Sequence, residues 1–241
     1  MSEPPRKRMV RPPGGGRDSG RGLGQRLKTA KSRTPSSQAW LERQLNDPYV
    51  AEARARGYRS RAAFKLSELD DAARLIRRGA RVIDLGSAPG GWLQVLVERG
   101  AGAVIGIDLL PVAPLAPAVI LQGDFTDPVC QAQLMEAAGG PVDLVLSDMA
   151  PNTTGHRQTD HIRIIGLIEA AAAFALTALK PGGALVAKAF QGGETADAIA
   201  HLKRHFDRVR PLKPKASRAE SAEVYLVATG FRGAPGQGVT P

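Results

Sequence analysis

Two lysines and two carboxylates occur at positions of the sequence where burying a charged side chain would be unfavourable. They are, in chain order, Lys65, Asp148, Lys188 and Glu223. Three of them lie in or at the end of apolar runs typical of strands, and Lys65 lies in a segment with helical periodicity. A buried charge is unfavourable unless an opposite charge is close by. If the fold brings the four together, we expect a site that tunes the ionisation of one member.

A second set of carboxylates follows the first four apolar runs: Asp84, Asp108, Asp124 and Asp148. In a parallel sheet they share the carboxyl edge, where ligands bind. The loop that begins at Asp84, DLGSAPGGW, has G-x-x-x-G-G spacing rather than the dinucleotide pattern G-x-G-x-x-G, and its Pro89 removes a backbone donor. Such an acidic edge favours an adenosyl sulfonium ligand with an α-amino group over NAD. Asp108 is placed to accept from ribose hydroxyls and Asp124 to reach the adenine amino group.

The elements that must position these side chains alternate along the chain. We expect seven strands, in RVIDLG, AVIGIDLL, AVILQGD, VDLVLSD, ALVAKAF, RVRPLKP and EVYLVATG. Helices are expected between them, with one over about 160–179 that is closed by KPGG, and two more precede the first strand. The pattern predicts a Rossmann-like α/β fold: one mostly parallel seven-stranded sheet with helices on both faces and a closing antiparallel pair.

Charge is distributed unevenly along the 241 residues. The net charge is +10, yet residues 1–36 hold ten Lys or Arg against two acidic residues. We predict a disordered basic arm over 1–36, one catalytic domain over 37–230 and a loose tail over 231–241. A basic arm on a nearly neutral domain favours a polyanionic partner such as nucleic acid, although it is also compatible with a solubilising tail.

The sequence argues against several other classes. The single Cys130 excludes an internal disulfide and fits a reducing compartment, and the four histidines lack metal-ligand spacing, so no metal is expected. We find no apolar stretch of membrane-spanning length and no secretory signal. A cytoplasmic monomer without a membrane partner is expected.

Six segments in order, DLGSAPGGW, DLLP, QGDF, SDMAPN, KAFQG and SRAESAEVYLVATG, closely resemble the FtsJ (RlmE) ribosomal RNA ribose 2′-O-methyltransferases. The resemblance runs from about Tyr58 to Gly230. It implies S-adenosylmethionine as cofactor and, as substrate, a uridine 2′-hydroxyl in the A-loop of large-subunit (23S) rRNA, within the assembled 50S particle. It also implies a catalytic tetrad of Lys65, Asp148, Lys188 and Glu223 with Lys188 as proton acceptor, and cofactor contacts from Gly90, Trp92, Asp108, Asp124 and Asp148.

The residues themselves suggest how such a tetrad works. A hydroxyl is a poor nucleophile until its proton leaves, so a base is useful. A lysine serves as that base only when burial or a second cation lowers its pKa, and Lys65 would be the second cation for Lys188. Two arginine-rich stretches, ARARGYRSRAAFK and the basic residues from Lys203 to Arg218, are either RNA contacts or ordinary surface charge.

Three other functions remain open from the sequence. The first is a ribose methyltransferase acting on tRNA or another RNA. The second is an NAD(P)-dependent oxidoreductase, against which the loop with Pro89 counts. The third is a catalytically silent RNA-binding assembly factor, against which the complete tetrad counts.

Overall fold

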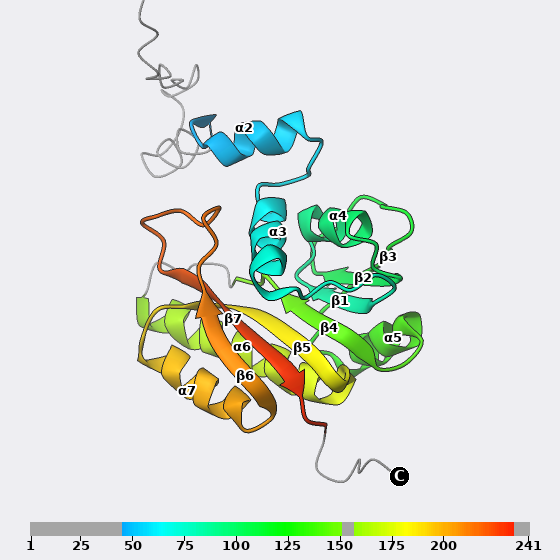
Figure 1. Ribbon diagram of the computed structural model, residues 1–241, viewed down its shortest axis with the longest axis vertical. Coiled ribbons are helices and arrows are strands. Elements are labelled where there is room, and N and C mark those ends of the chain that lie inside the picture. Colours follow the sequence, from blue (N-terminus) through cyan, green and yellow to red (C-terminus); the bar gives the residue numbers. More distant parts are fainter. Residues whose placement is uncertain (1–44, 151–156, 234–241) are drawn as a thin grey trace, which may run out of the picture. The chain divides into compact units, whose positions relative to one another are not determined.

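The computed structural model describes residues 45–150 and 157–233 (Figure 1). Contacts divide the chain into two units, Met1–Asn46 and Asp47–Pro241, and every element below belongs to the second. The predicted basic arm, residues 1–36, and most of the predicted tail, from residue 234 on, lie outside the described residues.

Helices and strands alternate as the sequence predicts. The helices are α2 (Pro48–Ala55), α3 (Ala62–Ala73), α4 (Gly91–Glu98), α5 (Pro128–Ala138), α6 (Arg157–Ala178) and α7 (Gly193–Lys203). The strands are β1 (Arg81–Leu85), β2 (Ala103–Asp108), β3 (Val119–Gln122), β4 (Val142–Ser147), β5 (Leu179–Phe190), β6 (Phe206–Leu212) and β7 (Glu223–Phe231). Across residues 45–150 and 157–233, none of the helices has the length and apolar character needed to cross a bilayer.

The seven strands form one sheet in the order β3-β2-β1-β4-β5-β7-β6. Pairing is parallel from β3 through β5, and β7 runs antiparallel to both β5 and β6. The predicted mostly parallel seven-stranded α/β sheet is therefore confirmed. Because β7 is reversed, its first residues lie at the edge where the parallel strands end.

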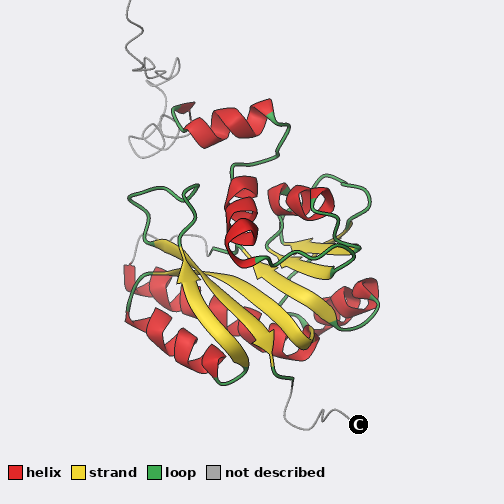
Figure 2. Cartoon of the chain, viewed as in Figure 1, coloured by secondary structure: helices red, strands yellow, loops and turns green. Residues whose placement is uncertain are grey.

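Helices cover both faces of the sheet (Figure 2). Alternate residues of a strand belong to two separate hydrophobic cores, one on each face of the sheet. In β1, Ile83 and Leu85 pack with residues of α5, α6 and α7, whereas Val82 packs with residues of α3 and α4. This period-two division explains why the central strands read as continuous apolar runs.

One local prediction needs correction. We expected KPGG to close a helix over about 160–179, but α6 ends at Ala178 and the KPGG segment belongs to β5. The β4–β5 register shifts between Val142 and Leu144, which makes this stretch an irregular start to the strand. Gly182 adopts φ 78°, a conformation that glycine takes without strain, so the glycines permit an irregular strand start as readily as a turn.

Candidate functional site

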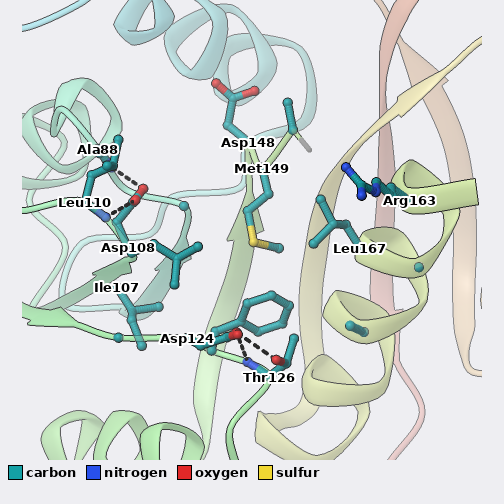
Figure 3. A pocket seen from close by; sticks show the side chains of 17 residues that line it. Ala88, Ile107, Asp108, Leu110, Asp124, Thr126, Asp148, Met149, Arg163 and Leu167 are labelled. Carbon is teal, nitrogen blue, oxygen red and sulfur yellow. Dashed lines mark hydrogen bonds between the residues drawn. The ribbon is translucent and has the colours of Figure 1, made fainter. Parts of the chain in front are cut away.

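A cavity of about 930 Å³ opens at the carboxyl edge of the sheet (Figure 3). It lies beside β1 and β4, where the strand order reverses, which is the usual ligand position in this architecture. Three predicted cofactor residues, Asp108, Asp124 and Asp148, line it. The structure thus gathers carboxylates that are far apart in the sequence around one space.

Two of these carboxylates are fixed by hydrogen bonds from the backbone. Asp108 accepts from the Ala88 N–H at 2.9 Å and from the Leu110 N–H at 2.8 Å, so it ties the glycine-rich loop to the end of β2. Asp124 accepts from the side chain of Thr126 at 2.7 Å and from its N–H at 2.9 Å. These bonds from Thr126 lower the pKa of the Asp124 carboxyl and keep it ionised.

Asp84, at the end of β1, is buried, and neither of its carboxylate oxygens has a hydrogen-bond partner within the described residues. Burial, and then the negative charges of Asp148 and Asp108, raise its pKa well above the usual range. Asp84 is not among the residues that line the large cavity, so its carboxyl does not itself face a ligand there.

The two remaining predicted cofactor residues occupy other places. Gly90 caps the start of α4 with φ 106°, and a Cβ there would lie 2.5 Å from the Arg59 guanidinium. Trp92 is buried in the core on the α3 and α4 side, where its indole N–H donates to the Ala62 carbonyl at 2.8 Å. Among the described residues, both lie outside the lining of the large cavity.

The four charged residues of the predicted tetrad form two ion pairs. Lys188 Nζ lies 3.0 Å from Asp148 Oδ1 and also donates to the Asp148 carbonyl at 2.6 Å. Lys65 Nζ lies 2.7 Å from Glu223 Oε1. All four side chains are less than one fifth exposed, so each charge is largely withdrawn from water and depends on its partner.

Tyr225 connects the Lys188–Asp148 pair to the Lys65–Glu223 pair. The sequence analysis did not identify it as a site residue. Its hydroxyl donates to Asp148 Oδ1 at 2.6 Å and accepts from Lys65 Nζ at 3.2 Å. Burial first, and then the charges of Asp148 and Glu223, raise its pKa well above the usual range, so the hydroxyl keeps its proton. A signal existed in the sequence: Tyr225 is two residues after Glu223 and therefore faces the same side of β7.

Strand register explains why these residues meet. Tyr225 pairs directly with Lys188 across β7 and β5, and Asp148 follows the last residue of β4, the strand beside β5. Lys65 comes from the first turn of α3. Asp148 alone belongs to both the ion-paired chain and the lining of the cavity, so the two halves of the site share one carboxylate.

The first arginine-rich stretch is largely engaged within the protein. Arg56 pairs with Glu52, and Arg61 lies 2.6 Å from Asp47. Arg59 donates to the carbonyls of residues 113 and 114 at 2.7 and 2.8 Å. In this stretch Arg54 remains exposed and Tyr58 packs edge-on against Phe64, so most of the stretch supports the fold.

The second basic stretch is divided among several surfaces. Lys203 and Arg204 end α7, whereas Arg208 and Arg210 lie on β6. Lys213 donates to two carbonyls of the loop before β7, and Arg218 pairs with Asp47 at 3.5 Å. In residues 45–150 and 157–233, no three His, Cys, Asp or Glu side chains are grouped as metal ligands would be.

Comparisons with known proteins agree on one family. Residues 58–231 match the model of the FtsJ-like methyltransferases. A "Ribosomal RNA large subunit methyltransferase E" from Caulobacter sp. (strain K31) is 66% identical over 225 residues, which are 93% of this chain and 100% of that protein. One of the same name from Acidiphilium cryptum is 61% identical, covering 86% and 92% of the two chains. A ribosomal RNA methyltransferase structure from Plasmodium falciparum superposes with TM-score 0.67 at 30% identity, over 73% of this chain and 100% of that one.

Proposed function

The chain belongs to the FtsJ-like methyltransferase family, and from that premise we propose that it methylates the ribose 2′-hydroxyl of a uridine in the A-loop of large-subunit rRNA, using S-adenosylmethionine. One observation carries the proposal: a hydrogen-bonded chain of two lysines, a tyrosine and two carboxylates adjoins an acidic cavity, and both include Asp148. We expect the protein to act as a cytoplasmic monomer on the assembled 50S particle.

The cavity fits the proposed cofactor. Asp108 and Asp124 would accept from ribose hydroxyls and the adenine amino group, and Asp148 would face the cationic end of the ligand. Three carboxylates against one arginine among the described residues of the cavity lining support a cationic ligand over a dinucleotide. Contacts from Gly90 and Trp92 rest on the resemblance of the loop sequence. The cofactor supplies a methyl group on a sulfonium centre, so the protein must align that group and remove a proton from the acceptor.

Lys188 is the proposed base. In its neutral amine form, Lys188 would take the proton of the 2′-hydroxyl at Nζ while that oxygen is methylated. Asp148 holds that nitrogen in place at 3.0 Å. Lys65, anchored by Glu223, would stabilise negative charge developing on the oxygen. Tyr225 fixes the distance between the two pairs through its hydroxyl. Much of the acceleration then comes from alignment.

The direct test uses large ribosomal subunits from cells that lack this protein. With tritiated S-adenosylmethionine, we expect label in 23S rRNA at one uridine, resistant to alkaline cleavage as a 2′-O-methyl ribose is. Label in tRNA instead would shift the substrate to another RNA. Binding without transfer would support a silent assembly factor, and stabilisation by NAD rather than S-adenosylhomocysteine would support an oxidoreductase.

Gly86 provides a test of the cavity. A Cβ at this position would lie 2.5 Å from Met149 Cγ, and both residues line the cavity. We expect Gly86→Ala to cost about 1–3 kcal/mol of unfolding free energy and to weaken S-adenosylhomocysteine binding in calorimetry. Gly79→Ala is the matched control, because Gly79 has nearly the same φ, 76° against 79°, with nothing within 4 Å of the added carbon. Equal cofactor affinity in both variants would contradict the assigned cavity.

Asp84 gives a pH-dependent prediction. A carboxyl whose pKa is raised by folding binds its proton more tightly in the native state, so stability falls as pH rises from the unfolded pKa toward the folded one. We expect Asp84→Asn to raise the unfolding free energy of the ligand-free protein at pH 7 by on the order of 2 kcal/mol and to flatten its pH dependence above pH 4. Urea titrations across pH 4–8 measure this. A variant less stable than the parent at pH 7 would show that Asp84 has a stabilising partner.

A further inference from the structure

A second cavity lies at the opposite edge of the sheet, where the parallel strands begin. Its volume is about 240 Å³, and Arg74 and Arg77 line it from the turn between α3 and β1. The rest of the lining comes from α3, that turn, β4, β5 and β7: Ala73, Leu75, Asp143, Gly182, Ala184, Thr229 and Gly230. Both arginine side chains are exposed, so the cavity presents positive charge to solvent.

Strand β6 forms the outer edge of the sheet (Figure 1). Its arginines extend the positive charge along that edge. Arg208 pairs with Thr229, a residue of the cavity lining, and Arg210 pairs with Val227 one step nearer the site. Leu212, the next residue on that face, pairs with Tyr225 of the ion-paired chain. Residues two apart on a strand share a face and stand about 6.8 Å apart. Two arginines therefore mark a line from the proposed catalytic edge to the second cavity.

The line lies on the face of the sheet that carries α3. The Arg210 guanidinium donates to the Ala72 carbonyl at the end of α3, at 2.8 Å. Lys65 lies in the first turn of the same helix. One helix thus connects the proposed catalytic lysine to the arginines of the second cavity. An extended ligand lying beside α3 and β6 would touch both.

The acidic residues nearest this line are already paired. Asp143 accepts from the Arg81 N–H at 2.9 Å and lies 2.6 Å from Lys180 Nζ. Asp71 pairs with Arg99 at 2.7 Å. Asp207 alternates to the other face of β6, beside Arg232. In contrast, no hydrogen bond or ion pair with a described residue holds the side chains of Arg77 and Arg208, although the charge of Arg77 helps to lower the pKa of the Asp143 carboxyl.

Arg74 adds an independent observation. It is the one non-glycine residue with positive φ in the described part of the chain, at 51°, and it caps α3 in the left-handed conformation. Glycine is the residue that takes this position without strain. An arginine held in a strained conformation beside a basic cavity is better explained by use of its side chain than by the turn itself.

We propose that Arg74, Arg77, Arg208 and Arg210 form a second RNA-binding surface, which holds phosphates of the large-subunit rRNA away from the nucleotide that is methylated. The inference rests on the proposed function and specifies a second place on the protein where the same rRNA substrate binds. Guanidinium groups bind phosphate oxygens without reading sequence, so this surface contributes affinity and register.

Arg77→Gln with Arg208→Gln tests the proposal without disturbing a hydrogen bond of the fold. For two lost phosphate contacts, we expect the slope of log Kd against log salt to become shallower by about 1.4–1.8. KM for large subunits should rise roughly tenfold near physiological salt, whereas kcat at saturating substrate and the Kd of S-adenosylhomocysteine should stay unchanged. Lys203→Gln with Arg204→Gln is the control. It removes the same charge from exposed positions at the end of α7, across the sheet, where the Arg204 guanidinium also contacts His201.

Arg74→Gly separates charge from folding. It removes a charge and relieves the left-handed strain, so Tm should stay equal or rise while KM for large subunits increases. The proposal would be overturned if the arginine variants had the same KM and salt slope as the control pair. It would also be overturned if they lost binding of inorganic phosphate but kept the RNA affinity of the parent protein. If the parent protein transfers no methyl group to large subunits, the proposed function fails, and salt-dependent filter binding of the same rRNA still decides whether these arginines bind it.

Discussion

Replacing Lys188 with alanine should lower single-turnover methyl transfer by roughly 10²–10⁴-fold at saturating RNA and cofactor. In our proposal its Nζ takes the proton of the 2′-hydroxyl, and the structure places that atom 3.0 Å from Asp148 and 2.6 Å from the Asp148 carbonyl. In the same proposal Lys65, which is paired with Glu223 at 2.7 Å, stabilises charge on the oxygen and does not take its proton. Cofactor affinity, measured with S-adenosylhomocysteine, should change far less than turnover.

Two further variants make this test specific. Lys188→Arg keeps a positive charge near Asp148 but cannot accept a proton, so it should be nearly as slow as alanine if the residue is a base. Lys180→Ala removes a lysine from the same strand that is also paired with an aspartate, Asp143 at 2.6 Å, but at the far end of β5. It should leave turnover unchanged. Near-parental turnover of Lys188→Ala would exclude Lys188 as the base.

Asp148→Asn should damage both halves of the site. The carboxylate lines the large cavity and also accepts from Lys188 and Tyr225. Removing its charge leaves Lys188, whose side chain is 9% exposed, without its ion-pair partner. We expect turnover to fall on the order of 100-fold and S-adenosylhomocysteine affinity to fall about tenfold, measured by single-turnover kinetics and calorimetry.

Asp108→Asn is the matched comparison, because Asp108 lines the same cavity but contacts none of the paired lysines among the described residues. It should weaken cofactor binding and spare turnover once cofactor is saturating. If Asp148→Asn behaved in the same way, with normal turnover at saturation, the carboxylate would serve the cofactor alone. The coupling between the two halves of the site would then be wrong.

Periodicity was enough to predict the fold because the central strands are buried on both faces, so each of them reads as a short apolar run. Asp148 and Lys188 could be placed at one edge by the same reasoning, since they lie at the ends of apolar runs in a parallel sheet. The KPGG segment could not be assigned to a strand in this way, because its glycines are compatible with both a turn and an irregular strand start.

Other parts of the site depend on tertiary contacts that a sequence pattern does not contain. Lys65 and Glu223 meet only because β7 inserts next to β5 and α3 packs over the sheet. Tyr225 reads as an ordinary aromatic of a buried strand until its hydroxyl partners are known. Similarly, Arg59 reads as an RNA contact, whereas it donates to backbone carbonyls 54 and 55 residues later.

The position of β7 at the end of the element order also determines when Lys65 can meet its partners during synthesis. Glu223 and Tyr225 reach the ligand edge because they begin a strand that runs against its neighbours, and that strand is the last element of the domain to be synthesised. Lys65 meets Tyr225 across 160 residues of sequence. During synthesis the carboxylates that line the large cavity, up to Asp148, are therefore made before Glu223 and Tyr225, and the contact between Lys65 and Tyr225 can form only after β7 has been made.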